Sequence, residues 1–144
     1  GIKDSKALGT LINHSENRLK LADIESLVNR CRDLQLLSVV CTNNIAVSKA
    51  VAMFNPNFIA VEPPELIGGD ISVTDADPDI VKNTVKDIRA ISPEIKVLCG
   101  AGVKNGKDVK KAIQLGAEGV LLASGVTKAK NPFQILEDLA KGAI

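Results

Sequence analysis

Residues 58–70 read FIAVEPPELIGGD, and this stretch indicates how the chain is organised. The apolar run over residues 58–61 predicts a buried strand, which delivers Glu62 at its end. Pro63 and Pro64 then exclude both a helix interior and a ladder partner, and the glycine pair at residues 68–69 frees the backbone again. We therefore expect a strand that ends in a carboxylate, followed by a loop.

Glu62 lies at the mouth of this predicted strand. Burial of a carboxyl group raises its pKa towards neutrality, and a general base needs a pKa near the working pH. Catalysis is one interpretation of this acid, and a solvated loop carboxylate is the other.

The composition is that of a globular protein without nucleic-acid chemistry. A length of 144 residues predicts one domain, over residues 1–144, and 45% hydrophobic with 24% charged residues is typical of this class. The net charge is +1, Lys and Arg are dispersed, and there are only three phenylalanines and no other aromatic residue. We expect no nucleic-acid partner, because a basic stripe and stacking rings are both missing.

The three cysteines, Cys31, Cys41 and Cys99, are far apart and form no C-x-x-C pair. Neither a disulfide framework nor a zinc site is expected, and we predict no bound metal. Reduced thiols are typical of the cytoplasm. No signal peptide opens the chain and no apolar run is long enough to span a bilayer, so we expect no membrane partner.

Strand and helix patterns alternate along the chain. Five apolar runs predict buried parallel strands, at residues 7–13, 36–42, 58–62, 95–100 and 119–123. Apolar helix faces lie between and after them: Ile24, Leu27, Val28 and Cys31; Val47, Val51 and Phe54; Ile80, Val81, Val85 and Ile88; Val109, Ala112 and Ile113; Ile135, Leu136 and Leu139.

Capping signals agree with these helices. Asp77 and Asn131 each precede a proline at a first helical position, and Gly116 follows Leu115 where a left-handed stop is needed. The alternation predicts an α/β fold with a parallel sheet, built either as an open doubly wound sheet or as part of a (β/α)8 barrel. In both, chemistry collects at the carboxyl ends of the strands.

Polar or small residues follow each predicted strand. His14, the only histidine, can polarise a carbonyl there, although a ring satisfied by neighbouring backbone is the simpler interpretation. The small-residue turns at residues 100–102 and 123–125 let backbone N–H groups approach an anion, and their place after the last two strands matches the usual phosphate site of barrels. A Walker A sequence and the third glycine of a dinucleotide fingerprint are both missing, so we expect no cofactor.

Several motifs together carry a family resemblance. Residues 9–18 (GTLINHSENR), 41–44 (CTNN), 60–68 (AVEPPELIG), 97–102 (VLCGAG) and 119–125 (GVLLASG) resemble those of archaeal-type triosephosphate isomerases, in the right order and at plausible spacing. The resemblance covers essentially the whole chain. It implies a TIM-barrel enzyme that interconverts dihydroxyacetone phosphate and glyceraldehyde 3-phosphate through an enediolate, as a step of glycolysis and gluconeogenesis.

The resemblance also implies roles for single residues. Glu62 matches the base, and His14 the neutral electrophile that polarises the carbonyl; this family is a standard example of such pKa tuning. Glu16 matches an acid that supports the site through a salt bridge, and Cys41 a packing residue beneath the base. Backbone amides at Ile67, Gly102, Ala123 and Ser124 match the phosphate-binding positions, and the lid begins at Pro63 and includes Gly68 and Gly69.

The sequence departs from the family in two ways. The lid usually continues Gly-Thr-Gly, whereas here it reads Gly68-Gly69-Asp70; the second glycine loosens the hinge and an acid near a bound dianion repels it. The match also begins inside the helix before the fourth strand of the family's barrel, so about five of eight βα units are expected. We therefore expect a fragment or a partial barrel that begins at Gly1.

The expected partial barrel has functional consequences. The lysine after the family's first strand has no counterpart here, and losing one oxyanion donor costs roughly 3 to 4 kcal/mol of transition-state stabilisation. We expect very low activity from this chain alone, and self-association through open sheet edges. The alternative is a non-catalytic phosphate-binding or self-assembling half-barrel.

Overall fold

Five parallel strands form one sheet in the computed structural model, which describes residues 1–67 and 69–144. Their order across the sheet is their order in the chain: β1 (Gly9–Ile12), β2 (Leu37–Thr42), β3 (Phe58–Val61), β4 (Lys96–Gly100) and β5 (Gly119–Leu121). A doubly wound sheet reverses its strand order at a switch point, and this sheet has no such reversal. The consecutive order is that of a partial β/α barrel, as one of the two expected architectures predicts.

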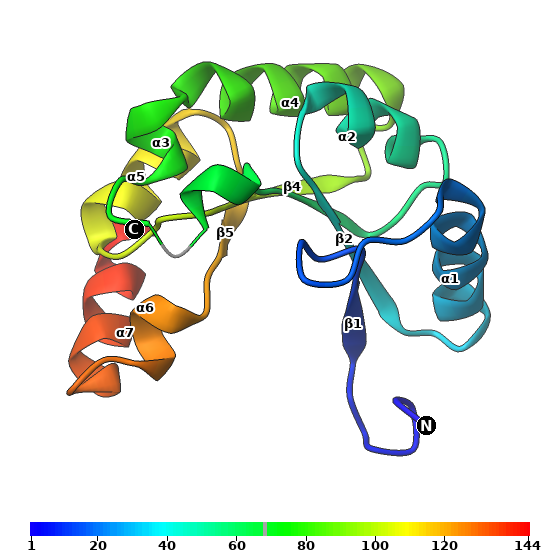
Figure 1. Ribbon diagram of the computed structural model, residues 1–144, viewed down its shortest axis with the longest axis horizontal. Coiled ribbons are helices and arrows are strands. Elements are labelled where there is room, and N and C mark those ends of the chain that lie inside the picture. The colour runs from blue at the N-terminus through cyan, green and yellow to red at the C-terminus, as the bar shows by residue number, and fades with distance from the viewer. Residues whose placement is uncertain (68) are drawn as a thin grey trace.

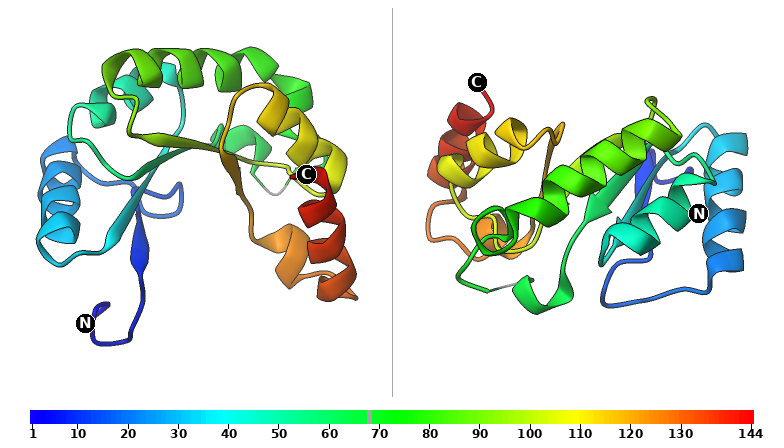
Figure 2. Two further views of the ribbon diagram at one scale, coloured as in Figure 1. Left: turned by 180° about the vertical axis from the view of Figure 1, so that it is seen from behind. Right: turned by 90° about the horizontal axis from the view of Figure 1, so that it is seen from above.

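The longer helices lie on the convex side of the curved sheet, so that the molecule forms an arch with an open inner side (Figure 1). They are α1 (Leu21–Asp33), α2 (Ile45–Ala52), α4 (Pro78–Ile91), α5 (Gly106–Gln114) and α7 (Pro132–Gly142). Figure 2 shows the same arrangement from behind and from above. Because all strands are parallel, their carboxyl ends meet at one edge of the sheet, and the loops that follow them share one side of the molecule.

The core lies between the sheet and these outer helices. Ile12, Val40, Ile59 and Val97 come from four neighbouring strands, point the same way and are at most 4% exposed. They pack against buried residues of α1, α2 and α4, namely Ile24, Val28, Val51, Val85 and Ile88. Full burial of each such side chain contributes about 1.5 to 3 kcal/mol, so this layer holds the strand ends in place.

The predicted helix ends are confirmed. The Asp77 carboxylate accepts a hydrogen bond from the Ile80 backbone N–H (3.1 Å), and the Asn131 side chain accepts one from Gln134 (3.3 Å). Gly116 has φ +101°, the left-handed conformation that ends α5 without steric cost.

Other expectations were wrong in detail. The first strand is shorter than residues 7–13 because Asn13 turns the chain with φ +63°, and the last ends at Leu121 rather than at residue 123. Leu27, Ile113 and Leu136 are exposed rather than core, since α1, α5 and α7 bury narrower stripes than the sequence pattern suggests. Three short helices were not foreseen: η1 (Pro64–Leu66), α3 (Val73–Ala76) and α6 (Ser124–Thr127).

Candidate functional site

A cavity of about 480 Å³ lies at the carboxyl ends of the strands. It brings together most of the residues singled out in the sequence: His14, Glu16, Glu62, Ile67, Gly69, Gly102, Ala123 and Ser124. A smaller cavity of about 280 Å³ lies near the amino ends of β2 and β3 and contains none of them. The chemistry predicted from the strand ends is thus concentrated in one place.

Glu62 follows β3 directly and is held by the sheet. Its backbone N–H donates to the Thr42 carbonyl (2.8 Å), and the residue is only 5% exposed. Burial raises the pKa of this carboxyl group, while Cys41, His14 and Arg18 lower it in part. Within the described residues its Oε2 atom is buried without a hydrogen-bond partner, which leaves an acceptor able to take a proton from a bound molecule.

His14 faces this carboxylate from the loop after β1. Its Nε2 atom lies 3.8 Å from Glu62 Oε2, and its side chain is 30% exposed. Its Nδ1 atom accepts from the Glu16 backbone N–H at 3.5 Å and lies 3.7 Å from the Glu16 carboxylate. Because Nδ1 accepts this hydrogen bond, a neutral ring carries its proton on Nε2. The Nε2–H group can therefore donate into the cavity.

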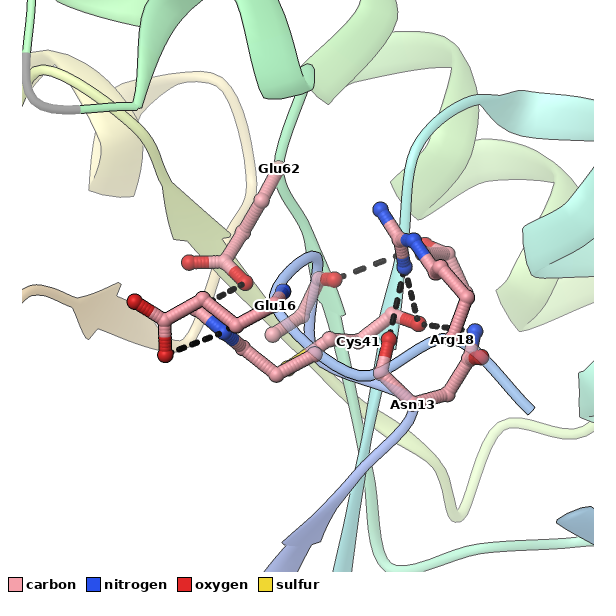
Figure 3. A network of polar contacts seen from close by, with 8 residues as sticks. Asn13, Glu16, Arg18, Cys41 and Glu62 are labelled. Carbon is pink, nitrogen blue, oxygen red and sulfur yellow. Dashed lines mark hydrogen bonds and ion pairs between the residues drawn. The ribbon is translucent and has the colours of Figure 1, made fainter.

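A network that sequence reasoning missed fixes the loop carrying His14 (Figure 3). The buried Asn13 side chain donates to the Cys41 carbonyl (2.9 Å) and accepts from the Leu19 backbone N–H (2.9 Å). Arg18 donates to the Asn13 carbonyl (2.6 Å) and reaches the Cys41 carbonyl at 3.4 Å. The signal available in the sequence was an asparagine at the end of an apolar run, because asparagine tolerates the left-handed φ of +63° that Asn13 adopts better than most residues do.

Cys41 and Cys99 flank the site as buried thiols. Burial, followed by the charge of Glu62, raises the pKa of both thiols, that of Cys99 to about 12. Neutral thiols are poor nucleophiles, so both cysteines act as packing groups here.

The loop after β4 has an unusual backbone. Ala101 and Gly102 have φ of +75° and +70°, and an alanine in this region carries steric strain. A Cβ on Gly102 would lie 2.1 Å from the Ile71 carbonyl oxygen, so only glycine allows the loop to approach the segment after the lid. The Val73 backbone N–H donates to the Ala101 carbonyl (3.1 Å) and fastens the same two segments.

The segment that the resemblance predicts to be a lid contains η1. Pro63 precedes this helix, Ile67 and Gly69 line the cavity, and Gly68 lies outside the described residues. Asp70 pairs with Lys104 of the loop after β4 (2.5 Å). This ion pair offsets the negative charge of Asp70 near the predicted anion site.

The described part of the chain contains neither a candidate metal centre nor a helix that could span a membrane. Among the described residues, no three His, Cys, Asp or Glu side chains are grouped so as to hold a metal ion. Within the same part of the chain, no helix combines the length and apolar character needed to cross a bilayer.

The matching family profile and two similar relatives all belong to one family. The profile of the family described as triosephosphate isomerase matches residues 1–139. The triosephosphate isomerase of Methanocaldococcus jannaschii is 58% identical over 140 residues, which are 97% of this chain and 64% of that protein. That of Methanobrevibacter smithii is 58% identical over 131 residues, 91% of this chain and 59% of that protein. The chain thus spans about three fifths of the length of these relatives.

Solved structures match the fold. Thiamine phosphate pyrophosphorylase from Pyrococcus furiosus superposes with a TM-score of 0.72 at 13% identity, over 99% of this chain and 62% of that one. A mandelate oxidase variant superposes with a TM-score of 0.64 at 22% identity, over 88% of this chain and 37% of the other. At these identities the likeness concerns the α/β barrel architecture alone.

Proposed function

The chain belongs to the triosephosphate isomerase family, and from that premise we propose that it interconverts dihydroxyacetone phosphate and glyceraldehyde 3-phosphate. One observation carries the proposal: the buried, partnerless Oε2 of Glu62 lies 3.8 Å from His14 Nε2 in a cavity lined by the Gly102 and Ser124 loops. A base, a donor and room for a phosphate are the three parts that this reaction needs.

The proton moves through Glu62 in the proposed reaction. The carboxylate removes a proton from the substrate carbon beside the carbonyl, and the resulting enediolate carries negative charge on oxygen. His14 gives its Nε2 proton to that oxygen and takes up the hydroxyl proton of the adjacent oxygen, which becomes the new carbonyl, while the proton held by Glu62 returns to the neighbouring carbon. The raised pKa of Glu62 supports this cycle, since a stronger base is better matched to a weakly acidic C–H group.

Backbone amides hold the phosphate in this proposal. Gly102, Ala123 and Ser124 line the cavity on the loops after β4 and β5, on the side where barrels bind phosphate. The Ile67 N–H instead donates to the Pro64 carbonyl (3.2 Å), so this amide must leave η1 before it can bind an anion. We therefore assign the segment from Pro63 to Asp70 as a lid that rearranges when substrate binds.

The Asp70–Lys104 pair gives a first test at the lid. Lys104 lowers the pKa of the Asp70 carboxyl group by hydrogen bonding and charge. In Lys104→Met, we expect that pKa to rise towards its ordinary value of 3.8, measured by carbon NMR of the carboxyl group. Lys110→Met, on α5, is the matched control. An Asp70 pKa that is the same in all three proteins would exclude the pairing.

The open sheet edges support a second part of the proposal, which is self-association. Among the described residues nothing pairs with the outer edges of β1 and β5, and Leu8, Leu11 and Leu37 are exposed nearby. Unpaired edges and apolar surface favour pairing with another copy. We expect light scattering at micromolar concentration to give a mass above 15.2 kDa, and a monomer would contradict this.

We also propose a cytoplasmic location, which the buried free cysteines support.

The function is tested on the purified chain by isomerisation of glyceraldehyde 3-phosphate and by binding of a phosphorylated analogue of the enediolate. Turnover and binding that both depend on Glu62 support the isomerase. Binding of inorganic phosphate without turnover, and without dependence on Glu62, favours instead a phosphate-binding module built on the loops after β4 and β5.

A further inference from the structure

Gly100, the last residue of β4, lies directly beside Glu62. The register of β3 and β4 aligns Val61 with Cys99, so the next residues of the two segments, Glu62 and Gly100, are neighbours. Gly100 is buried. A Cβ placed on it would lie 2.5 Å from both Cγ and Oε1 of Glu62 and 2.8 Å from Cδ. The Glu62 side chain therefore occupies the space that any other residue at position 100 would fill.

We propose that Gly100 is a positioning residue for Glu62: its missing side chain lets the carboxyl group lie across the end of β4 and face His14. The proposal deepens the isomerase function and rests on it. Cys41, which is fully buried on the neighbouring strand β2, stands on the other side of Glu62. The Cys41 side chain thus fills the space on one side of the carboxyl group, and the missing side chain of Gly100 leaves space on the other side.

The expected damage from a side chain at position 100 is local. The three atoms that the new Cβ meets all belong to the side chain of Glu62, which can turn about its own bonds. At Gly102 and Gly106, by contrast, a Cβ would meet backbone atoms first, at 2.1 Å and 2.4 Å. We infer that Gly100→Ala shifts the carboxyl group while leaving the sheet in place.

The first measurement is the kinetics of Gly100→Ala. A displacement of about 1 Å between reacting groups costs up to about 100-fold in rate, so we expect kcat to fall about 10- to 100-fold with little change in KM. Gly119→Ala on β5 is the matched control, because its Cβ would meet Leu98 at an ordinary 3.4 Å. An unchanged kcat in Gly100→Ala overturns the proposal.

The second measurement does not depend on activity. We expect Gly100→Ala to lower the thermal midpoint by about 3 to 6 °C when Glu62 is present, and not to lower it in a Glu62→Ala background. An equal loss in both backgrounds overturns the proposal, because the strain would then come from the fold and not from the carboxyl group. If the loss is confined to the Glu62 background and the chain shows no turnover, the steric assignment holds and the proposal that this chain alone is an isomerase is overturned.

Discussion

Glu62→Gln is expected to lower the rate of isomerisation by about 10²- to 10⁴-fold, the contribution of a well-placed general base. The amide keeps the size and shape of the side chain, but it cannot accept a proton at neutral pH. The measurement is kcat/KM with glyceraldehyde 3-phosphate.

A control variant separates this effect from contamination and misfolding. Glu25→Gln, which removes an exposed acid on α1, should leave the rate unchanged when it is purified in the same way. Equal activity of Glu62→Gln and the unsubstituted chain would show that the activity comes from a contaminating enzyme or from another residue, and it would remove Glu62 from the mechanism.

The pH dependence of activity and of stability gives a further test of Glu62, with Glu62→Gln as the comparison. A base works when ionised, so kcat/KM should fall as the pH drops through the raised pKa of Glu62. The stability of the fold should change with pH in the opposite direction to the activity. Because the folded pKa lies above the unfolded one, the folded chain holds this proton more tightly, and stability is lost as the pH rises from about 4.5 through the folded pKa. Glu62→Gln should lack this loss.

Most of the fold was predictable because its signals are local. Short apolar runs define the five strands, which are three to six residues long, and caps such as Asp77 and Asn131 depend only on residues three positions away. The exposed positions of Leu27 and Leu136 were not predictable, since exposure depends on which neighbours cover a helix flank. Short helices such as η1 leave too little periodicity to detect.

The residues of the site at the strand ends were predictable, but the contacts that hold them in place were not. Parallel strands place their carboxyl ends together, which is enough to bring His14 and Glu62 into one cavity. Arg18 and Gly100 were missed as supports of that pair because they act through space, on a backbone carbonyl and on a side chain of a neighbouring strand. The same holds for Asp70, whose partner Lys104 is 34 residues away.

His14→Gln is expected to lower kcat by about 10²- to 10³-fold, the usual cost of losing one preorganised donor to a developing oxyanion, because the flexible glutamine amide does not keep its N–H in the place of the ring N–H. The Nε2 atom of the ring lies 3.8 Å from Glu62 Oε2, so base and donor face the same small volume where the reacting atoms fit. The Glu16 backbone N–H at Nδ1 (3.5 Å) sets the tautomer and the orientation of the ring, whereas the glutamine amide turns about one more bond and is not held with its N–H at the position of Nε2–H. Single-turnover kinetics measure the chemical step directly.

A split between catalysis and binding distinguishes this role from a structural one. If His14 acts on the oxyanion, its loss should lower kcat while inorganic phosphate binds His14→Gln and the unsubstituted chain alike, because the phosphate loops follow β4 and β5 and do not involve β1. A loss of phosphate affinity as large as the loss of kcat would instead mean that the loop over residues 13–18 has collapsed. In that case the Asn13 and Arg18 network, and not the imidazole, would be the part that the site cannot do without.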